Sequence, residues 1–189
     1  MKSFIQHFLA RFALGIITLA LPVMAQAEPK LDMHRVGVRA DDGSGWHLAV
    51  SSKGSFSVLM PIPFNDFTTH DATTGESTYV VGAKSSEGIK FSAVELPSGG
   101  KALPDLASVL KTLAANAANK VSDVSRSTKG DADILTLTVA NASATLYMRC
   151  IQMNGARYTL TIEFPNAHRE LVAASKDRFF DSFKLKAKS

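Results

Sequence analysis

The stretch that decides the fold is Ala144-Thr-Leu-Tyr-Met-Arg-Cys-Ile-Gln-Met153, then Asn154-Gly155, then Ala156-Arg-Tyr-Thr-Leu-Thr-Ile-Glu-Phe-Pro165. In both halves apolar and polar side chains alternate, which is the period of a β-strand with one buried face. The Asn-Gly dipeptide between them is typical of a tight turn. The segment therefore predicts an antiparallel hairpin.

The register of this hairpin depends on the length of its loop. A two-residue turn would place Tyr158 opposite Ile151, so that the apolar row of one strand would face the polar row of the other. Because a slip of one residue moves every side chain to the other face, we expect the burial pattern to prevail. The expected loop is Met153 to Gly155, with Gly155 left-handed in a bulge. This register pairs Cys150 with Tyr158, Met148 with Leu160, Leu146 with Ile162 and Ala144 with Phe164.

A third alternating strand precedes this pair and carries Leu135, Leu137 and Val139. A turn near Asn141-Ala142 would set Val139 beside Ala144. Working outward, we expect strands at 46–51, 55–60, 77–83 and 89–96, and a short strand at 34–39. Pro61 and Pro63 should stop regular pairing.

Two segments have helical periodicity. In 103–119 the apolar residues recur at helical spacing, with Pro104 and Asp105 suited to the first turn. The second helix is expected from about 166 to 181. The predicted fold class is α+β, an antiparallel sheet of about six to seven strands with two main helices packed on it.

The N-terminus has the three zones of a secretory signal peptide: a basic start, an apolar run from Phe12 to Leu21, and Ala25-Gln26-Ala27 before Glu28. The apolar run is about half as long as a membrane span requires. We therefore expect cleavage after Ala27, no membrane span afterwards and a periplasmic location. The remaining chain divides into a polar lead-in at 28–45 and a single domain at 46–189.

The composition makes the mature chain only weakly basic. The formal net charge is +4, and it falls to about +2 when Lys2 and Arg11 leave with the leader. No run of clustered cations and aromatic residues indicates nucleic-acid binding. Lys and Arg residues are frequent near the C-terminus, where they would be solvated or touch anionic lipid. Cys150 is the only cysteine, so it is either buried as a small apolar residue or paired with another chain.

No catalytic or metal-binding constellation stands out in the sequence. Ser108 and Lys111 have the spacing of a Ser-x-x-Lys motif, but the companion motifs are missing and an ordinary helix is the simpler interpretation. His34, His47, His70 and His168 do not share ligand spacing. We expect no enzyme activity, no cofactor and no resident metal.

The second face of the three strands is the candidate partner surface. In the expected register it gathers Tyr147, Arg149 and Arg157, residue types that are enriched at contact hot spots. The alternative is a solvated sheet face, or one closed by a loop. Trp46 is expected to anchor the core behind the first strand.

The chain also resembles the PsbP-like fold family, which includes DcrB-like bacterial envelope proteins. The resemblance covers roughly 46–185 and ends on an aromatic-Ser-Phe-Lys signature. The residues that carry it are Trp46, Phe56-Ser57-Val58, Met60-Pro61, Pro63, Gly75, Tyr79, Phe91, Arg157-Tyr158 and Phe179-Phe180-Asp181-Ser182-Phe183-Lys184. The family implies a sheet with helices packed on it and non-enzymatic accessory or binding roles.

Taken together, the expected function is that of an exported accessory or binding domain of the cell envelope, whose partner is an envelope protein. The alternative is a periplasmic carrier of a small ligand or metal, and an undetected enzyme is the third possibility. A pocket lined by convergent polar groups would favour the carrier. A flat patch with an apolar centre would favour the protein partner.

Overall fold

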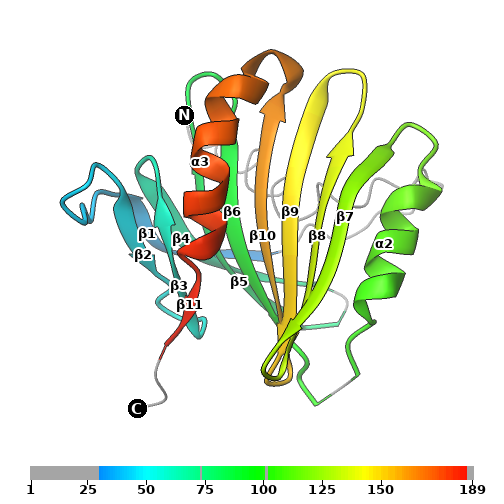
Figure 1. Ribbon diagram of the computed structural model, residues 1–189. Coiled ribbons are helices and arrows are strands. Elements are labelled where there is room, and N and C mark those ends of the chain that lie inside the picture. The colour runs from blue at the N-terminus through cyan, green and yellow to red at the C-terminus, as the bar shows by residue number, and fades with distance from the viewer. Residues whose placement is uncertain (1–29, 73, 101, 187–189) are drawn as a thin grey trace.

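Two antiparallel sheets and two helices make up the fold of the computed structural model, which describes residues 30–72, 74–100 and 102–186 (Figure 1). The larger sheet has eight strands in the order β1-β4-β5-β6-β10-β9-β8-β7. The smaller sheet has three, in the order β11-β3-β2. The expected leader, including its cleavage residues Ala25, Ala27 and Glu28, lies outside the described residues.

The elements follow the chain in this order: β1 (Lys30–Val38), β2 (His47–Val50), β3 (Phe56–Met60), β4 (Phe64–His70), β5 (Ser77–Lys84), β6 (Lys90–Pro97), α2 (Leu106–Ala115), β7 (Lys120–Lys129), β8 (Ala132–Ala140), β9 (Ala144–Met153), β10 (Ala156–Pro165), the short 3-10 turn Asn166–His168, α3 (Arg169–Asp181) and β11 (Lys184–Leu185).

The hairpin register predicted from the burial pattern is wrong. β9 and β10 are joined by a two-residue turn in which Asn154 and Gly155 both have positive φ, 52° and 69°. Tyr158 therefore pairs with Ile151, and Thr159 pairs with Cys150. Cys150 and Tyr158 point to opposite faces, since alternate residues of a strand do.

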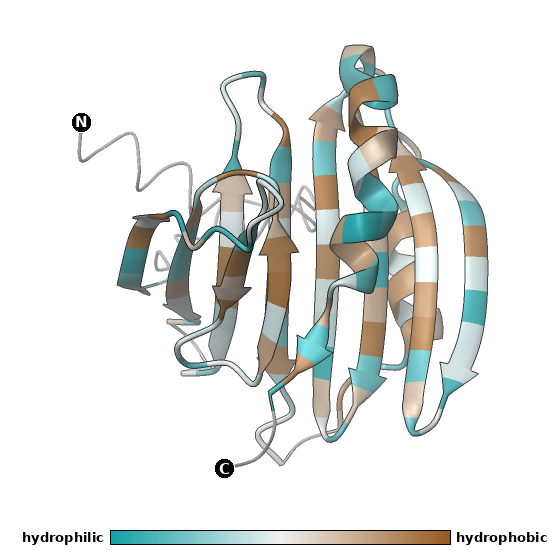
Figure 2. Cartoon of the chain, turned by 60° about the vertical axis from the view of Figure 1, so that its left-hand side comes forward, coloured by the Kyte–Doolittle hydropathy of each residue, from teal (hydrophilic) through white to brown (hydrophobic). Residues whose placement is uncertain are grey.

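The physical reason is that both faces of the large sheet are buried, each under a different helix. Met148 and Cys150 of β9 join the cluster under α2, and Ile151 joins the cluster under α3. Figure 2 shows α3 in front of the central strands and α2 behind them. The main apolar row of β9 lies on the α2 face, and the apolar row of β10 lies on the α3 face. Because a helix covers each face, apolar residues can be buried on either one, and pairing an apolar row with a polar row carries no burial penalty.

The larger core lies under α3 and the small sheet. Val172, Phe179 and Phe180 of α3 are buried against the inward side chains of β10. Phe56, Val58 and Met60 of β3 are fully buried in the same cluster. β11 then pairs with β3, so the C-terminal signature closes this core. Ser182 lies in the chain between α3 and β11, and its hydroxyl accepts a hydrogen bond from the Leu59 N–H of β3 at 2.9 Å.

The smaller core lies on the opposite face, under α2. Leu106 and Leu113 of the helix pack against an inward row from β8 and β9. That row is Leu135, Leu137, Val139, Met148 and Cys150. The predicted neighbours across the β8–β9 turn share this face, but the pairing is shifted by two residues, with Val139 opposite Leu146.

The sheet is larger than the six to seven strands predicted, because strands with weak alternation escaped the sequence analysis. In β4 the polar side chains of Asp66 and Thr68 are buried, so the apolar pattern breaks. β7 is an edge strand, and most of its residues are exposed and polar. β1 spans Lys30–Val38, so much of the expected lead-in belongs to the sheet. Both helices are shorter than expected.

Candidate functional site

The three residues of the predicted partner surface do not share a face. Arg149 pairs with Leu160 and Tyr147 pairs with Ile162, which places both on the α3 face. Arg157 pairs with Gln152 and lies on the α2 face. The predicted contact surface depended on the register corrected above, and it is divided between the two sides of the sheet.

Tyr147 and Arg149 contact α3 rather than open solvent. The Arg149 guanidinium donates to Asp181 at 2.7 Å and lies 5.0 Å from the Phe180 ring. The Tyr147 ring packs on Phe164 with centroids 5.0 Å apart. Lys176 of α3 covers the other side of Tyr147 at 5.2 Å. These contacts attach α3 to the sheet, as cation–π and ion-pair contacts do elsewhere.

Arg157 instead reaches the segment that begins α2. Its guanidinium donates to the backbone carbonyl of Pro104, the residue before the helix cap. Asp105 caps the helix and accepts from the Ser108 N–H at 2.7 Å. Hydrogen bonds from Ser108 hold the pKa of Asp105 below its ordinary value, with Arg126 and Arg157 adding to the effect. The start of α2 is therefore a charged region.

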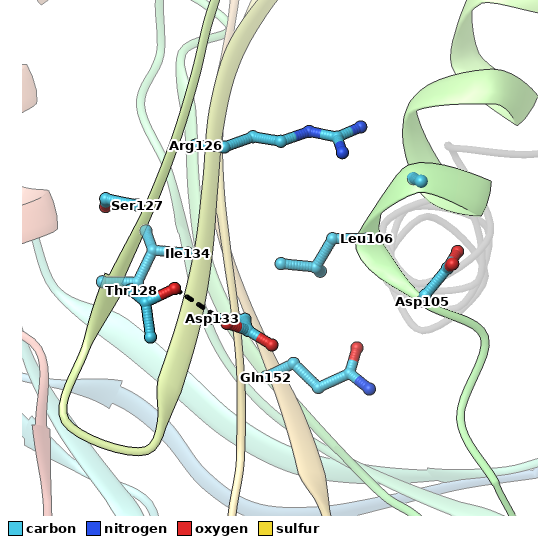
Figure 3. A pocket seen from close by; sticks show the side chains of 9 residues that line it. Asp105, Leu106, Arg126, Ser127, Thr128, Asp133, Ile134 and Gln152 are labelled. Atoms are coloured by element: carbon cyan, nitrogen blue, oxygen red, sulfur yellow. Dashed lines mark hydrogen bonds between the residues drawn. The ribbon is translucent and has the colours of Figure 1, made fainter.

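A cavity of about 360 Å³ opens beside this charged helix start. Figure 3 shows Arg126 extending from β7 towards α2, with Asp133 and Gln152 below it and Leu106 between. The Thr128 hydroxyl donates to Asp133 at 3.1 Å. The lining residues are Asp105, Leu106, Ala107, Arg126, Ser127, Thr128, Asp133, Ile134 and Gln152. Its volume falls in the range of small-ligand sites.

Two buried polar atoms at this place have no hydrogen-bond partner. They are the side-chain oxygen of Gln152 and the Nε of Arg157. Gln152 lines the cavity, and Arg157 is its cross-strand partner on the same face of the sheet. Leaving such groups unpaired costs free energy, so they are the atoms that a polar ligand or a water would satisfy.

Asp133, Gln152 and Arg157 form one row across three neighbouring strands, since Asp133 also pairs with Gln152. Together with Asp105 and Arg126 the row presents both signs of charge within one site. An arrangement of this kind can bind groups by charge and hydrogen bonding.

The Cys150 side chain is buried in the same face, one strand position inward from Gln152. The residue is 1% exposed, and burial raises the pKa of its thiol. A thiol of raised pKa is a poor nucleophile. The structure agrees with the interpretation of Cys150 as a small buried residue.

A chain of three polar side chains occurs elsewhere, on the α3 side of β1, β4 and β5. Ser77 Oγ lies 2.9 Å from His70 Nδ1, and His70 Nε2 lies 3.0 Å from Asp32. The hydrogen bond from His70 lowers the pKa of Asp32. The adjoining turn uses its N–H groups internally, at Asp71, Thr74, Gly75 and Glu76. The hydrogen bonds of Ser77, His70 and Asp32 link strands β5, β4 and β1.

Other residues singled out in the sequence analysis make contacts within the fold. His34 bonds Thr68 at 2.8 Å, and Ser108 takes part in the cap of α2. Trp46 is partly buried against the larger core, with Arg178 4.6 Å from its ring. In the part of the chain that the structure describes, no three His, Cys, Asp or Glu side chains gather as metal ligands. Within the same residues, no helix is long and apolar enough to cross a membrane.

Sequence reasoning did not find the cavity, because one of its walls is formed by Arg126, Ser127 and Thr128 of a strand that was not predicted. Arg126 and Thr128 belong to β7, which has no apolar periodicity. Gln152 follows Ile151 near the end of β9, next to the predicted loop, and nothing in its position indicated a site. The one available signal was Asp105 with Arg157, a helix cap and a strand arginine whose proximity only the fold reveals.

The chain has similarity to solved structures and none to curated sequences or family models. It is similar to LpqN, involved in cell envelope biogenesis of Mycobacterium tuberculosis, at 14% identity and a TM-score of 0.36, over 88% of this chain and 90% of that one. It is also similar to the cyanobacterial PsbP (CyanoP) of Synechocystis sp. PCC 6803, at 10% identity and a TM-score of 0.42, over 88% and 98%. Both TM-scores are below 0.5 and both identities are below 25%.

Proposed function

We propose that this chain is an exported, non-catalytic binding domain of the cell envelope, and that its binding site is the cavity beside the start of α2. The observation that carries the proposal is the convergence there of Arg126, Asp105 and Asp133 with the unpaired oxygen of Gln152. Convergent polar groups in a concave site are typical of ligand recognition. The arrangement favours the carrier alternative of the sequence analysis over a flat protein-binding patch.

The chemistry of the lining selects a small polar ligand that carries both charges. A carboxylate would bind Arg126, and an ammonium would bind Asp105 or Asp133. An amide group could satisfy both Gln152 and the Nε of Arg157. A short peptide offers all three groups, and so does the charged end of a partner protein.

Titration with free dipeptides tests this site. Alanyl-alanine is compared with its N-acetylated and C-amidated forms, with amide chemical shifts as the readout. We expect perturbed signals around Gln152 and Arg126, weaker binding of each blocked form, and loss of binding in Gln152→Leu and Arg126→Ala. Lys129→Ala is the matched control, since Lys129 is exposed on the same strand but does not line the cavity. Unperturbed signals at the cavity with every peptide would overturn the ligand assignment.

A charged segment of an envelope protein is the second source of the same chemistry. Crosslinking in intact cells from a photoreactive residue at position 127 separates the two sources. A crosslinked protein that disappears in Gln152→Leu would identify a macromolecular partner. The export part of the proposal predicts that the secreted form begins at Glu28, which intact-mass measurement checks.

A further inference from the structure

The small sheet has an outer face that takes no part in the core. In β2 and β3 alternate residues are buried, namely Ala49, Phe56, Val58 and Met60. The residues between them therefore point outward. Leu48 pairs with Leu59, Val50 pairs with Ser57, and Ser57 pairs in turn with Lys184 of β11. We call Leu48, Val50, Ser57, Leu59 and Lys184 the outer face.

Two neighbouring aliphatic side chains on this face, Leu48 and Val50, are exposed to solvent. Leu48 is 46% exposed and Val50 is 37% exposed, and they share one side of a four-residue strand. The Arg35 guanidinium donates to the backbone carbonyl of Val50, so β1 adjoins the patch at this end. Val36, the next residue of β1, is 69% exposed. Neighbouring exposed aliphatic residues mark an interaction surface more often than single ones do.

Positive charge adjoins the aliphatic residues. Lys184 lies across the ladder from Val50, through Ser57, and Lys186 follows with its N–H bonded to the Ser55 carbonyl at 2.8 Å. Among the described residues, neither lysine forms an ion pair. The acidic residues Asp41 and Asp42 precede the opposite end of β2, and Asp42 is paired with Arg178 at 3.5 Å.

We propose that the outer face of the small sheet docks on the surface of an anionic lipid bilayer. Aliphatic side chains beside lysines suit the boundary between acyl chains and acidic head groups. A protein partner is disfavoured, because the centres of protein interfaces are enriched in aromatic residues and arginine and depleted in lysine. The face has two lysines nearby, and its apolar side chains Leu48, Val50 and Leu59 are all aliphatic.

The docking is weak and reversible, because a few aliphatic residues bury little area. The docking requires both the aliphatic side chains and the lysines, because membrane attachment by a single weak signal is marginal. The position also suits the proposed function, since the cavity beside α2 belongs to the other side of the large sheet and stays accessible.

Vesicle co-sedimentation tests the proposal, with processed protein purified from the envelope fraction. Vesicles of phosphatidylcholine alone are compared with vesicles that contain phosphatidylglycerol. We expect binding only to the anionic vesicles, weakened by salt, with affinity falling about fivefold for each of Lys184→Gln and Lys186→Gln. The double variant Leu48→Ser with Val50→Ser should abolish sedimentation. Thermal unfolding of each variant confirms that it is folded.

Leu171→Ser is the matched control, because Leu171 is 62% exposed and lies near the N-terminal end of α3, whereas β11 follows the C-terminal end. It should bind like the parent protein. Equal binding to both vesicle types would overturn the proposal, and so would equal loss in Leu171→Ser. The proposal also fails if the double variant Leu48→Ser with Val50→Ser still sediments with anionic vesicles. This holds even where that variant has lost a crosslink to a protein, because such a result would assign the face to a protein partner. None of these results depends on the dipeptide site, so the two proposals fail separately.

Discussion

Replacing Arg149 by alanine is expected to loosen α3 from the sheet rather than to remove a partner contact. The guanidinium makes two contacts with the helix, an ion pair with Asp181 at 2.7 Å and a cation–π contact with Phe180 at 5.0 Å. The Asp181 side chain is 68% exposed, so the ion pair is largely screened and contributes at most about 1 kcal/mol. The contact with the buried Phe180 ring contributes about 0.5–1 kcal/mol.

One atom acts in the opposite direction. The Nε of Arg149 is buried without a hydrogen-bond partner, and its removal relieves a desolvation cost. We therefore expect Arg149→Ala to lower the free energy of unfolding by roughly 1–2 kcal/mol, or the melting temperature by roughly 2–8 °C for a chain of this size. Arg149→Met should lose less than Arg149→Ala, because its methylene groups still cover the Phe180 ring.

Urea unfolding followed by circular dichroism measures this effect, with Asp181→Ala completing a double-mutant cycle. Arg126→Ala is the control, since Arg126 is exposed and its loss should change stability by less than about 0.5 kcal/mol. An unchanged urea midpoint in Arg149→Ala would refute the reasoning. If that variant also lost a partner, the sequence-based interpretation of Arg149 as a contact residue would be restored.

Three further changes test the packing. Gly54→Ala should destabilise by roughly 1–3 kcal/mol in urea unfolding, because its Cβ would lie 2.8 Å from Oε2 of the buried Glu95; an unchanged midpoint would contradict the close packing there. Leu137→Ala and Leu160→Ala should each cost about 2–5 kcal/mol and add within about 0.5 kcal/mol, because they belong to different cores; strong coupling would contradict this separation. Asp105→Ala should weaken α2 at neutral pH. Because the folded pKa of Asp105 is lowered, its contribution is fully present above the ordinary carboxyl pKa and is lost as pH falls through the folded pKa, so the stability difference between parent and variant should shrink as the pH is lowered from 6 towards 3. A constant difference between pH 6 and pH 3 would contradict that role.

The fold class could be predicted from the sequence because the central strands alternate clearly. β8, β9 and β10 each carry an apolar row, and the periodicity of α2 was visible around Leu106 and Leu113. The pattern does not state which face each row occupies. The alternation within one strand is the same whether the apolar row of the next strand lies on the same face or on the opposite face. The relative placement of the two rows is therefore set by the turn at Asn154-Gly155.

The site could not be predicted for the same reason. Tyr147 and Arg149 stand on the polar side of β9, which the alternation could not assign to solvent or to a cover, and α3 covers that side. Arg157 was assigned to their face through the register and lies on the other one. Strand β4 was missed because it contains buried polar residues. Asp66 can be buried there because Arg35 and the Ser52 N–H donate hydrogen bonds to its carboxylate. Such compensation depends on residues far away in the chain.

The most direct test of the account is a disulfide trap that uses the single native cysteine. Thr159 pairs with Cys150, and their side-chain oxygen and sulfur atoms lie 3.9 Å apart. In the folded, oxidised protein, Thr159→Cys should form an intramolecular disulfide with Cys150, since the two side chains share one face. Tyr158→Cys should keep two free thiols. A disulfide in Tyr158→Cys and none in Thr159→Cys would show that β9 and β10 turn their apolar rows to the same side, which contradicts the two-faced packing and the placement of the site.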